Sequence, residues 1–261
     1  AILDLKDEIN LVAVFDGHGE NGELVAEFLS QNLPTTLLAY FDSEDWEGYS
    51  PSAVVPSCFQ LLDQMVTDNV GQRKLRASGA TATVVLHRGN SMLVGCCGDS
   101  RAVLGSGGGK PRAITTAHNP AEPAERARIE ASGGEVGVFD GEPTVEQTGM
   151  GRVFVAGKQE PGLATARAFG DLLGKSCGVT AEPEIFALNN VKQRQVLIVA
   201  SDGVWDVVDD ESAVRLAMEY AQNQDAQSAA DVLVQEARML WEQRPGSERT
   251  IDDISASVTF F

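Results

Sequence analysis

NLVAVFDGHG at residues 10–19 and VLIVASDG at residues 196–203 follow the same pattern. In each, an apolar run typical of a buried strand ends at an aspartate that a glycine follows. We expect the strands to end at Phe15 and Ala200, so that Asp16 and Asp202 can point their carboxylates into a cleft at the sheet edge. The glycine lets the backbone turn sharply and brings a carbonyl oxygen near any bound ion. Taken singly, an Asp-Gly pair is often no more than a turn.

A third acidic pair, Asp252-Asp253, stands just before an expected C-terminal strand over residues 255–261. Carboxylates brought together from these three places would repel one another unless cations lay between them. Ligand oxygens favour hard ions, Mg²⁺ or Mn²⁺, over Zn²⁺, and two such ions can activate a shared water for attack on phosphorus. His18 lies close enough to Asp16 to protonate a leaving alkoxide. A lone histidine is more often structural, but this one shares a glycine-flanked turn with a proposed ligand.

The rest of the chain alternates strand and helix signals that indicate hairpins rather than a wound parallel sheet. Pro34 is expected to end the first helix, and the strand over 101–104 to continue the sheet of the hairpin before it. The expected helices cover 20–32, 52–73, 122–131, 209–220 and 226–242, and the other expected strands cover 81–87 and 91–97, joined by a turn at 88–90.

These elements predict an α+β fold, because the helices come as an early and a late pair with strands between them. The economical packing is a four-layer α-β-β-α sandwich, in which two mostly antiparallel sheets lie face to face with helical layers outside. No stretch has the composition of a flexible linker, so residues 1–261 are predicted to form a single domain.

Composition excludes several classes of function. The 38 acidic and 20 basic residues give a net charge of −18, which disfavours a nucleic-acid partner. No apolar run approaches the roughly 18–20 residues needed to cross a bilayer, so no membrane partner is expected. The four cysteines form no zinc-binding pattern and are expected as buried thiols of a reducing compartment, cytoplasmic or nuclear. A monomer is expected.

Six segments, in order along the chain, carry a resemblance to a known family. Singly each is weak, but together they span nearly the whole sequence and resemble the ordered motif series of type 2C metal-dependent protein phosphatases. They are Phe15-Asp16-Gly17-His18-Gly19, Ser78-Gly79-Ala80-Thr81-Ala82, Gly98-Asp99-Ser100-Arg101-Ala102, Leu163-Ala164-Thr165-Ala166-Arg167-Ala168-Phe169-Gly170-Asp171, Ala200-Ser201-Asp202-Gly203-Val204-Trp205-Asp206 and Asp252-Asp253-Ile254-Ser255.

The resemblance implies the sheet pair just described and a binuclear Mg²⁺ or Mn²⁺ centre. By this resemblance Asp16 bridges both ions, Gly17 gives its carbonyl, and Asp202 and Asp252 bind one of the ions. His18 would be the general acid. The implied function is Mg/Mn-dependent hydrolysis of phosphoserine and phosphothreonine in phosphoprotein substrates by a metal-activated water.

Other motif residues are interpreted as structural. Small residues over 78–82 suit strand packing beside the cleft, and Trp205 is a core anchor. Asp99 and Arg101 are predicted to brace a turn as a pair. Arg167 and Asp171 are predicted to lock the loop under the site rather than to touch substrate.

The sequence departs from the family pattern in three places. Ala117 stands where the family has an aspartate that helps to hold a third, weaker metal, so that third site is in doubt. Residues 1–10 contain no match to the family's upstream arginine and acidic residue: either the chain is trimmed or another arginine substitutes. An insertion is predicted at about 135–162, with a mobile and dispensable flap over 137–150 that influences substrate choice.

Two alternatives stay open at this point. A catalytically weak or dead pseudophosphatase acting as a binding scaffold is favoured only by Ala117 and the missing upstream residues, since Asp16, Asp202 and Asp252 all remain. A metal-dependent phosphodiesterase or nuclease on another fold is disfavoured by the acidic surface.

Overall fold

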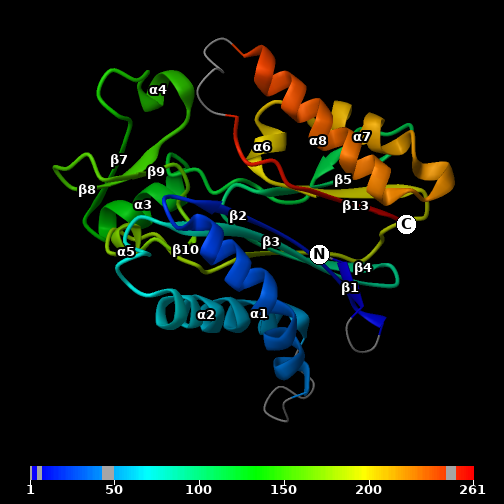
Figure 1. Cartoon of the computed structure of the whole chain (residues 1–261), viewed down its shortest axis with the longest axis horizontal. Helices are drawn as coiled ribbons and strands as arrows, with labels where there is room; N and C mark the ends of the chain where they lie inside the picture. The colour runs from blue at the N-terminus through cyan, green and yellow to red at the C-terminus, as the bar shows by residue number, and fades with distance from the viewer. Residues whose placement is uncertain (1, 5–7, 43–49, 245–250) are drawn as a thin grey trace.

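Two antiparallel sheets form the centre of the molecule in the computed structural model, which describes residues 2–4, 8–42, 50–244 and 251–261 (Figure 1). The larger sheet has the order β1-β2-β3-β4-β11, and β10 also pairs with β3. Its strands are β1 (Ile2–Asp4), β2 (Asn10–His18), β3 (Gly79–Arg88), β4 (Ser91–Cys97), β10 (Phe169–Gly170) and β11 (Glu184–Leu188).

The second sheet has the order β13-β12-β5-β6 and packs against the first. Its strands are β5 (Arg101–Ser106), β6 (Arg112–Ala113), β12 (Gln195–Ala200) and β13 (Ala256–Phe260). Side chains of β12 alternate in direction, because successive residues of a strand face opposite sides. Leu197 and Val199 join the core between the sheets, whereas Val196 and Ile198 join the core under the outer helices.

Helices cover the outer face of each sheet (Figure 1). α1 (Gly22–Asp42) and α2 (Pro51–Val70) pack on the larger sheet through Leu29, Phe59 and Leu62. α7 (Asp210–Met218) and α8 (Ala226–Gln243) pack on the smaller sheet through Val214 and Leu233. The α+β fold and the four-layer α-β-β-α order predicted from the sequence are confirmed.

Three local predictions are wrong. Pro34 lies inside α1 and does not end it. A proline inside a helix costs about 3 kcal/mol, but burying Leu33 and Leu37 on the sheet returns roughly 1.5–3 kcal/mol each. The first strand does not end at Phe15, because Asp16, Gly17 and His18 continue the ladder opposite Thr81, Ala80 and Gly79.

The third error concerns the strand after Cys97. β5 does not continue the sheet of β3 and β4; it pairs with β12 in the facing sheet. The chain crosses between the sheets at Gly98–Ser100, where Thr81 and Thr83 of β3 hydrogen bond to Ser100 at 2.7 and 2.8 Å. These bonds fix the crossing at one open end of the sandwich.

A third, small sheet lies beside the sandwich. β7 (Gly134–Gly137), β8 (Arg152–Val155) and β9 (Pro161–Leu163) pair antiparallel. With α3 (Pro123–Ala131) and α5 (Leu172–Lys175) they enclose a separate core of Ile129, Val153, Ala168 and Cys177. The predicted insertion at 135–162 is therefore more ordered than its composition indicated.

Only part of the predicted flap at 137–150 packs on this sheet. Phe139 lies edge-on to Phe154 at 5.3 Å, and the guanidinium of Arg152 lies 5.2 Å from the Phe139 ring. At the other end Asn119 donates to the Gly149 carbonyl at 2.6 Å. Between them lies the short helix α4 (Val145–Thr148), and residues 140–144 and 146–150 are exposed.

Replacing residues 140–148 by a short Gly-Ser turn is expected to change the melting temperature by no more than about 2 °C, because the segment buries little apolar surface. Phe139→Ala is expected to cost about 1–2 kcal/mol, since it removes the contact with Phe154. Thermal and urea unfolding of both variants measures this. A large loss of stability on replacing the loop, with no loss in Phe139→Ala, would contradict the conclusion that Phe139, and not residues 140–148, packs on the small sheet.

Candidate metal centre

Four carboxylates gather where the chain crosses between the sheets. Asp16 is on the same face of β2 as Val12 and Val14, which lie in the core between the sheets, so its side chain also faces inward. Asp99 lies in the crossing itself. Asp202 begins α6 (Asp202–Trp205) directly after β12, and Asp252 precedes β13, the neighbour of β12.

Ser201 fastens two of these segments together. Its Oγ donates to the Asp253 carbonyl at 3.1 Å and accepts from the Ser255 backbone N–H at 3.1 Å. Gly203 permits this approach, because a Cβ there would lie 2.2 Å from the Asp253 oxygen. The Ser-Asp-Gly sequence thus holds the segment of Asp252 beside Asp202.

Gly17, near the end of β2, also permits a close approach of two backbone segments. A Cβ on Gly17 would lie 2.4 Å from the carbonyl oxygen of Gly22, where α1 begins. Any side chain would push the helix away from β2. The glycine therefore lets α1 start directly beside the strand that carries Asp16 and His18.

The carboxylates lie close enough for their charges to interact. Burial raises the pKa of Asp16 to about 9, together with a hydrogen bond and charge repulsion from Asp202 and charges on Asp252 and Asp99. Burial and then the charge of Asp202 raise the pKa of Asp99 to about 7. The pKa of Asp252 is raised by burial and by Asp202.

This donor set fits a hard divalent cation. The Oδ1 atom of Asp202 is buried and has no hydrogen-bond partner among the described residues. All the converging side-chain donors are carboxylate oxygens, the ligands that Mg²⁺ and Mn²⁺ prefer. In the part of the chain that the structure describes, no three acidic, histidine or cysteine side chains close on one point. That Asp16, Gly17, Asp202 and Asp252 ligate metal stays a prediction.

His18 is held by Asp171, at the N-terminus of α5. Its Nε2 lies 2.5 Å from Asp171 Oδ2, and the Asp171 side chain is only 2% exposed. Burial alone would lower the pKa of His18, but the charge of Asp171 and this hydrogen bond outweigh it and raise that pKa above 6.5. Asp171 therefore favours the protonated imidazolium.

Asp171 is itself positioned by α2. Asp63 accepts from the Gly170 backbone N–H at 3.0 Å and forms an ion pair with Lys175. The Asp171 N–H donates to the Ser78 carbonyl at 2.9 Å. The loop prediction for Asp171 was incomplete, since this residue also contacts the candidate general acid.

The predicted Asp99–Arg101 pair is wrong. Arg101 instead pairs with Asp210 at 3.1 Å and lies 4.8 Å from the centre of the Trp205 ring. Asp99 belongs to the carboxylate cluster. The rule that found Asp16 and Asp202 misses Asp99, because glycine precedes this aspartate and Ser100 follows it; a search for any acid just after a buried strand would have found it. Trp205 is half-buried, and its Nε1 donates to the carbonyls of Ala200 and Arg101 at 2.9 and 3.2 Å.

Arg167 braces the neighbouring loop, as predicted. It binds the buried carboxylate of Glu125 at 2.6 Å and the Glu182 carbonyl at 2.9 Å.

Ala117 lies half-buried beside the centre, because His118 next to it hydrogen bonds through its backbone N–H to the Gly98 carbonyl. Of residues 1–10, where the family's upstream arginine has no match, residues 1 and 5–7 lie outside the described residues.

Comparison with known proteins agrees with this architecture. The family profile described as protein phosphatase 2C matches residues 2–240. Probable protein phosphatase 2C 61 of Arabidopsis thaliana is 34% identical over 266 residues, covering 98% of this chain and 77% of the relative. Probable protein phosphatase 2C 64 of Oryza sativa subsp. japonica is 35% identical over 256 residues, covering 95% of this chain and 57% of the relative.

Solved structures resemble the chain over nearly its whole length. A sex-determining protein of C. elegans has a TM-score of 0.77 at 25% identity, with 98% of this chain and 57% of that chain covered. A serine-threonine phosphatase 2C from Toxoplasma gondii has a TM-score of 0.73 at 23% identity, with 98% and 86% covered. The second likeness shows the fold alone.

The family profile and the curated relatives show that the chain is a protein phosphatase of a family whose members depend on divalent metal. More particularly, the chain belongs to the protein phosphatase 2C family and is a protein serine/threonine phosphatase. The family implies divalent-metal dependence without specifying the ions. The alternative of a dead pseudophosphatase gains no support from these comparisons. Among the described residues, no helix is both long and apolar enough to cross a membrane.

Asp171→Asn is expected to lower the pKa of His18, because it removes the carboxylate that favours the imidazolium. At neutral pH less His18 is then protonated, so kcat on alkyl phosphates falls about tenfold and its alkaline limb moves to lower pH. NMR titration of the metal-free protein gives the His18 pKa. His118, whose pKa burial lowers to about 4, is the internal reference. An unchanged His18 titration would contradict the pairing.

Proposed function

We propose that the chain hydrolyses phosphoserine and phosphothreonine in protein substrates at this centre, with two Mg²⁺ or Mn²⁺ ions as cofactors. The observation that carries the proposal is the group of Asp16, Asp99, Asp202 and Asp252, whose charges repel at one end of the sandwich. A cluster of this kind destabilises the folded protein unless positive charge compensates it. Cation binding therefore explains why the chain holds these carboxylates together, whereas a purely structural role does not.

Four residues would hold the ions. Asp16 reaches the cleft from β2 and would bridge both ions, the Gly17 carbonyl would ligate one, and Asp202 and Asp252 would ligate from the other sheet. When bound, such ions neutralise the carboxylates and lower the pKa of a water so that it can attack phosphorus. The protein's part is to present these oxygens from two rigid sheets.

His18 would supply the proton that the departing serine or threonine oxygen needs. An alkoxide is a poor leaving group, so donation of a proton to that oxygen lowers the barrier. Asp171 occupies Nε2 and leaves Nδ1, which has no hydrogen-bond partner among the described residues, to act as donor. Asp171 also maintains the charged form from which the proton is given.

Ala117 indicates that a third ion is absent or weakly held. Its methyl group offers no oxygen at the edge of the centre where the family has a carboxylate. The expected stoichiometry is therefore two ions for each chain, and calorimetric titration with Mn²⁺ counts them. Three ions of similar affinity would contradict this part of the proposal.

The cellular compartment, oligomeric state and partners of the enzyme are also proposals. Burial raises the pKa of the Cys58 and Cys96 thiols to about 12, so these are unreactive core thiols suited to a reducing compartment such as cytoplasm or nucleus. We propose a monomer that acts on phosphoproteins and not on nucleic acid, in keeping with its charge of −18.

Asp16→Asn is expected to reduce turnover at least about a thousandfold and to abolish the rise in melting temperature that Mn²⁺ gives the wild type. The metal-free variant should in turn be more stable than metal-free wild type, by on the order of 1–4 kcal/mol at pH 7, because Asp16 must take up a proton on folding at this pH and an amide need not. The folded pKa of Asp16 is about 9 against 3.8 unfolded, so metal-free wild type should lose stability as the pH rises between these values.

Asp140→Asn removes the same charge from the exposed part of the insertion and is the matched control. It should change neither turnover nor the effect of Mn²⁺. Full Mn²⁺ stabilisation in Asp16→Asn would refute the ligand assignment, whatever its activity.

His18→Gln is expected to slow hydrolysis of a phosphothreonine peptide about a hundredfold more than that of p-nitrophenyl phosphate. The aryl leaving group is stable without a proton and so needs the acid less. The ratio of the two kcat values measures the effect, with His87→Gln, at the other end of β3, as control. Equal losses on both substrates would reject the role of general acid.

A further inference from the structure

The opposite end of the sandwich contains a cavity of about 300 Å³. It opens between the two sheets, where β5 and β11 end and β12 begins, and Leu104 and Leu188 form its apolar part. Gln195 begins β12 and Asp202 follows the other end of that strand, so at about 3.3 Å for each residue the cavity lies roughly 20 Å from the metal centre. It is thus separate from the site described above.

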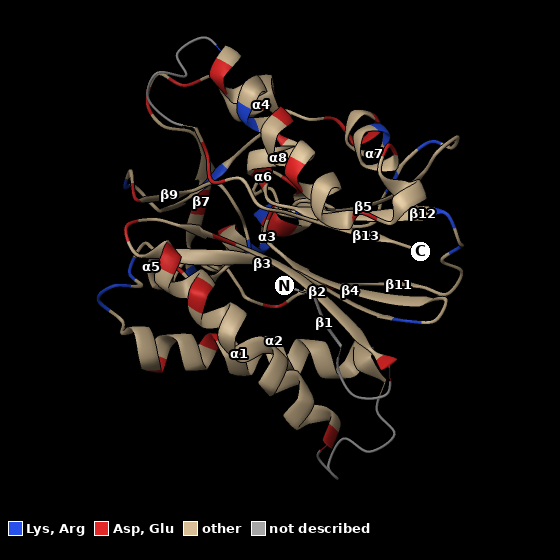
Figure 2. Ribbon diagram, turned by 45° about the vertical axis from the view of Figure 1, so that its right-hand side comes forward, with Lys and Arg blue, Asp and Glu red and all other residues tan. Residues whose placement is uncertain are grey.

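Three loops at this end of an acidic molecule are basic. Three loops meet there, at residues 88–91, 106–112 and 189–195, and none of them contains an aspartate or glutamate. They contain five basic residues, here called the basic end: Arg88, Lys110, Arg112, Lys192 and Arg194. Figure 2 shows blue segments at this side, near the labels β11 and β12, away from most of the red ones. With 38 acids to 20 bases in the chain, three neighbouring loops without acids are a marked departure.

Within the part of the chain that the structure describes, the residues of the basic end have no acidic partner. Among the described residues none of the five forms an ion pair, whereas Arg101, Arg126, Arg128, Arg152 and Arg167 all do. A second hollow lined by Asn90, Lys192 and Gln193 shares Asn190 with the cavity, so the surface is continuous. Positive charge without an internal partner is available to an external anion.

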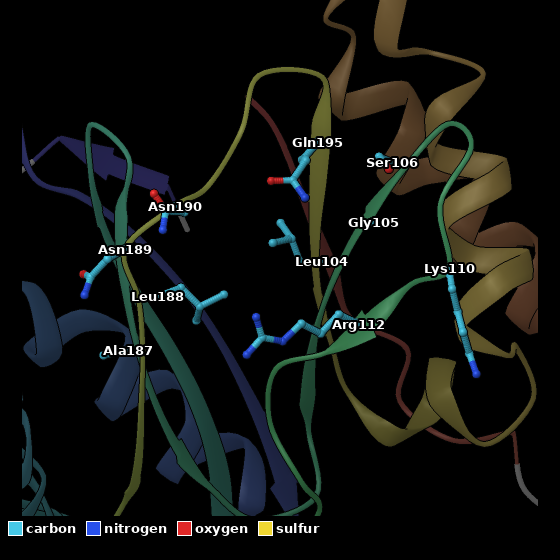
Figure 3. Close-up of a pocket in the computed structure, with 10 residues that line it drawn as sticks. All are labelled: Leu104, Gly105, Ser106, Lys110, Arg112, Ala187, Leu188, Asn189, Asn190 and Gln195. Carbon is cyan, nitrogen blue, oxygen red and sulfur yellow. The ribbon is translucent and has the colours of Figure 1, made fainter.

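Arg112 is placed to bind such an anion directly. Figure 3 shows its guanidinium reaching from β6 across the cavity toward Leu188, while Lys110 points away from it. The Oε1 of Gln195 accepts from the Lys192 backbone N–H at 2.7 Å, which leaves the amide N–H groups of Gln195 free to donate into the cavity. The cavity therefore presents a planar cation and neutral donors over an apolar floor.

We propose that this cavity is a binding site for a phosphate group, with Arg112 as its principal ligand and the side-chain amide of Gln195 as a second donor. A guanidinium binds two phosphate oxygens at once, and amide donors satisfy others. The volume of about 300 Å³ is at the lower end of ligand pockets and admits a phosphate together with the side chain that carries it. The source is either free inorganic phosphate or a phosphorylated residue of a protein.

Amide NMR of the metal-loaded enzyme tests the site, because it separates this cavity from the metal centre. The probes are inorganic phosphate, a peptide with the non-hydrolysable phosphonate analogue of phosphoserine, and the same peptide with serine. Saturable shifts are expected at the amides of Gly105, Ser106, Asn190 and Gln195. Arg112→Gln should weaken this binding about tenfold or more. Arg238→Gln, which removes an equal charge from the exposed face of α8, should leave it unchanged.

Each outcome decides the proposal. Tighter binding of the phosphonate peptide than of phosphate supports the site with a phosphorylated protein as its source, and equal binding supports it with free phosphate. Absence of shifts at these amides with both phosphate probes overturns the proposal, as does binding that Arg112→Gln leaves unchanged. Arg112 is exposed and lies on a short edge strand, so its variant is expected to fold. Kinetics at the metal centre should be unaltered in both variants on p-nitrophenyl phosphate.

Discussion

The carboxylates of Asp16, Asp99 and Asp202 are held closer together than their charges favour. Two sheets hold them there, since each acid lies in or just after a strand whose side chains are locked into a core on both faces. Repulsion worth a few kcal/mol is small beside the burial of several dozen apolar side chains, each contributing about 1.5–3 kcal/mol before entropy is counted. The raised pKa values of Asp16 and Asp99, and the proposed need for cations, follow from this enforced proximity.

The layer order could be predicted from the sequence because it follows from alternation and from the pairing of helices, which are local patterns. Pro34 shows where a local rule fails: burial of Leu33 and Leu37 outweighs the lost hydrogen bond. β5 shows a second limit. A tight turn after Cys97 looks the same in sequence whether the next strand returns to its own sheet or crosses to the facing one, and only the Thr81 and Thr83 contacts with Ser100 distinguish the two.

The candidate site likewise contains some residues that the sequence predicts and others that it does not. Asp16, Asp202 and Asp252 could be proposed from the sequence because each borders an apolar strand. The pairing of His18 with Asp171, and of Arg101 with Asp210, joins residues far apart in the chain, and no spacing encodes it. The cavity beside Arg112 was not foreseen either, because its lining comes from strand ends and loops of both sheets that have no motif in common.

The hydrogen bonds of Ser201 to Asp253 and Ser255 affect the order in which the site assembles during synthesis. Asp16 is made early in synthesis, but its proposed partner Asp252 reaches it only after β13 has paired with β12 and Ser201 has bound the segment before β13. Contacts between such distant parts of a chain form slowly. A nascent chain that has not yet extended through β13 would therefore lack the assembled carboxylate cluster on which the proposed activity depends.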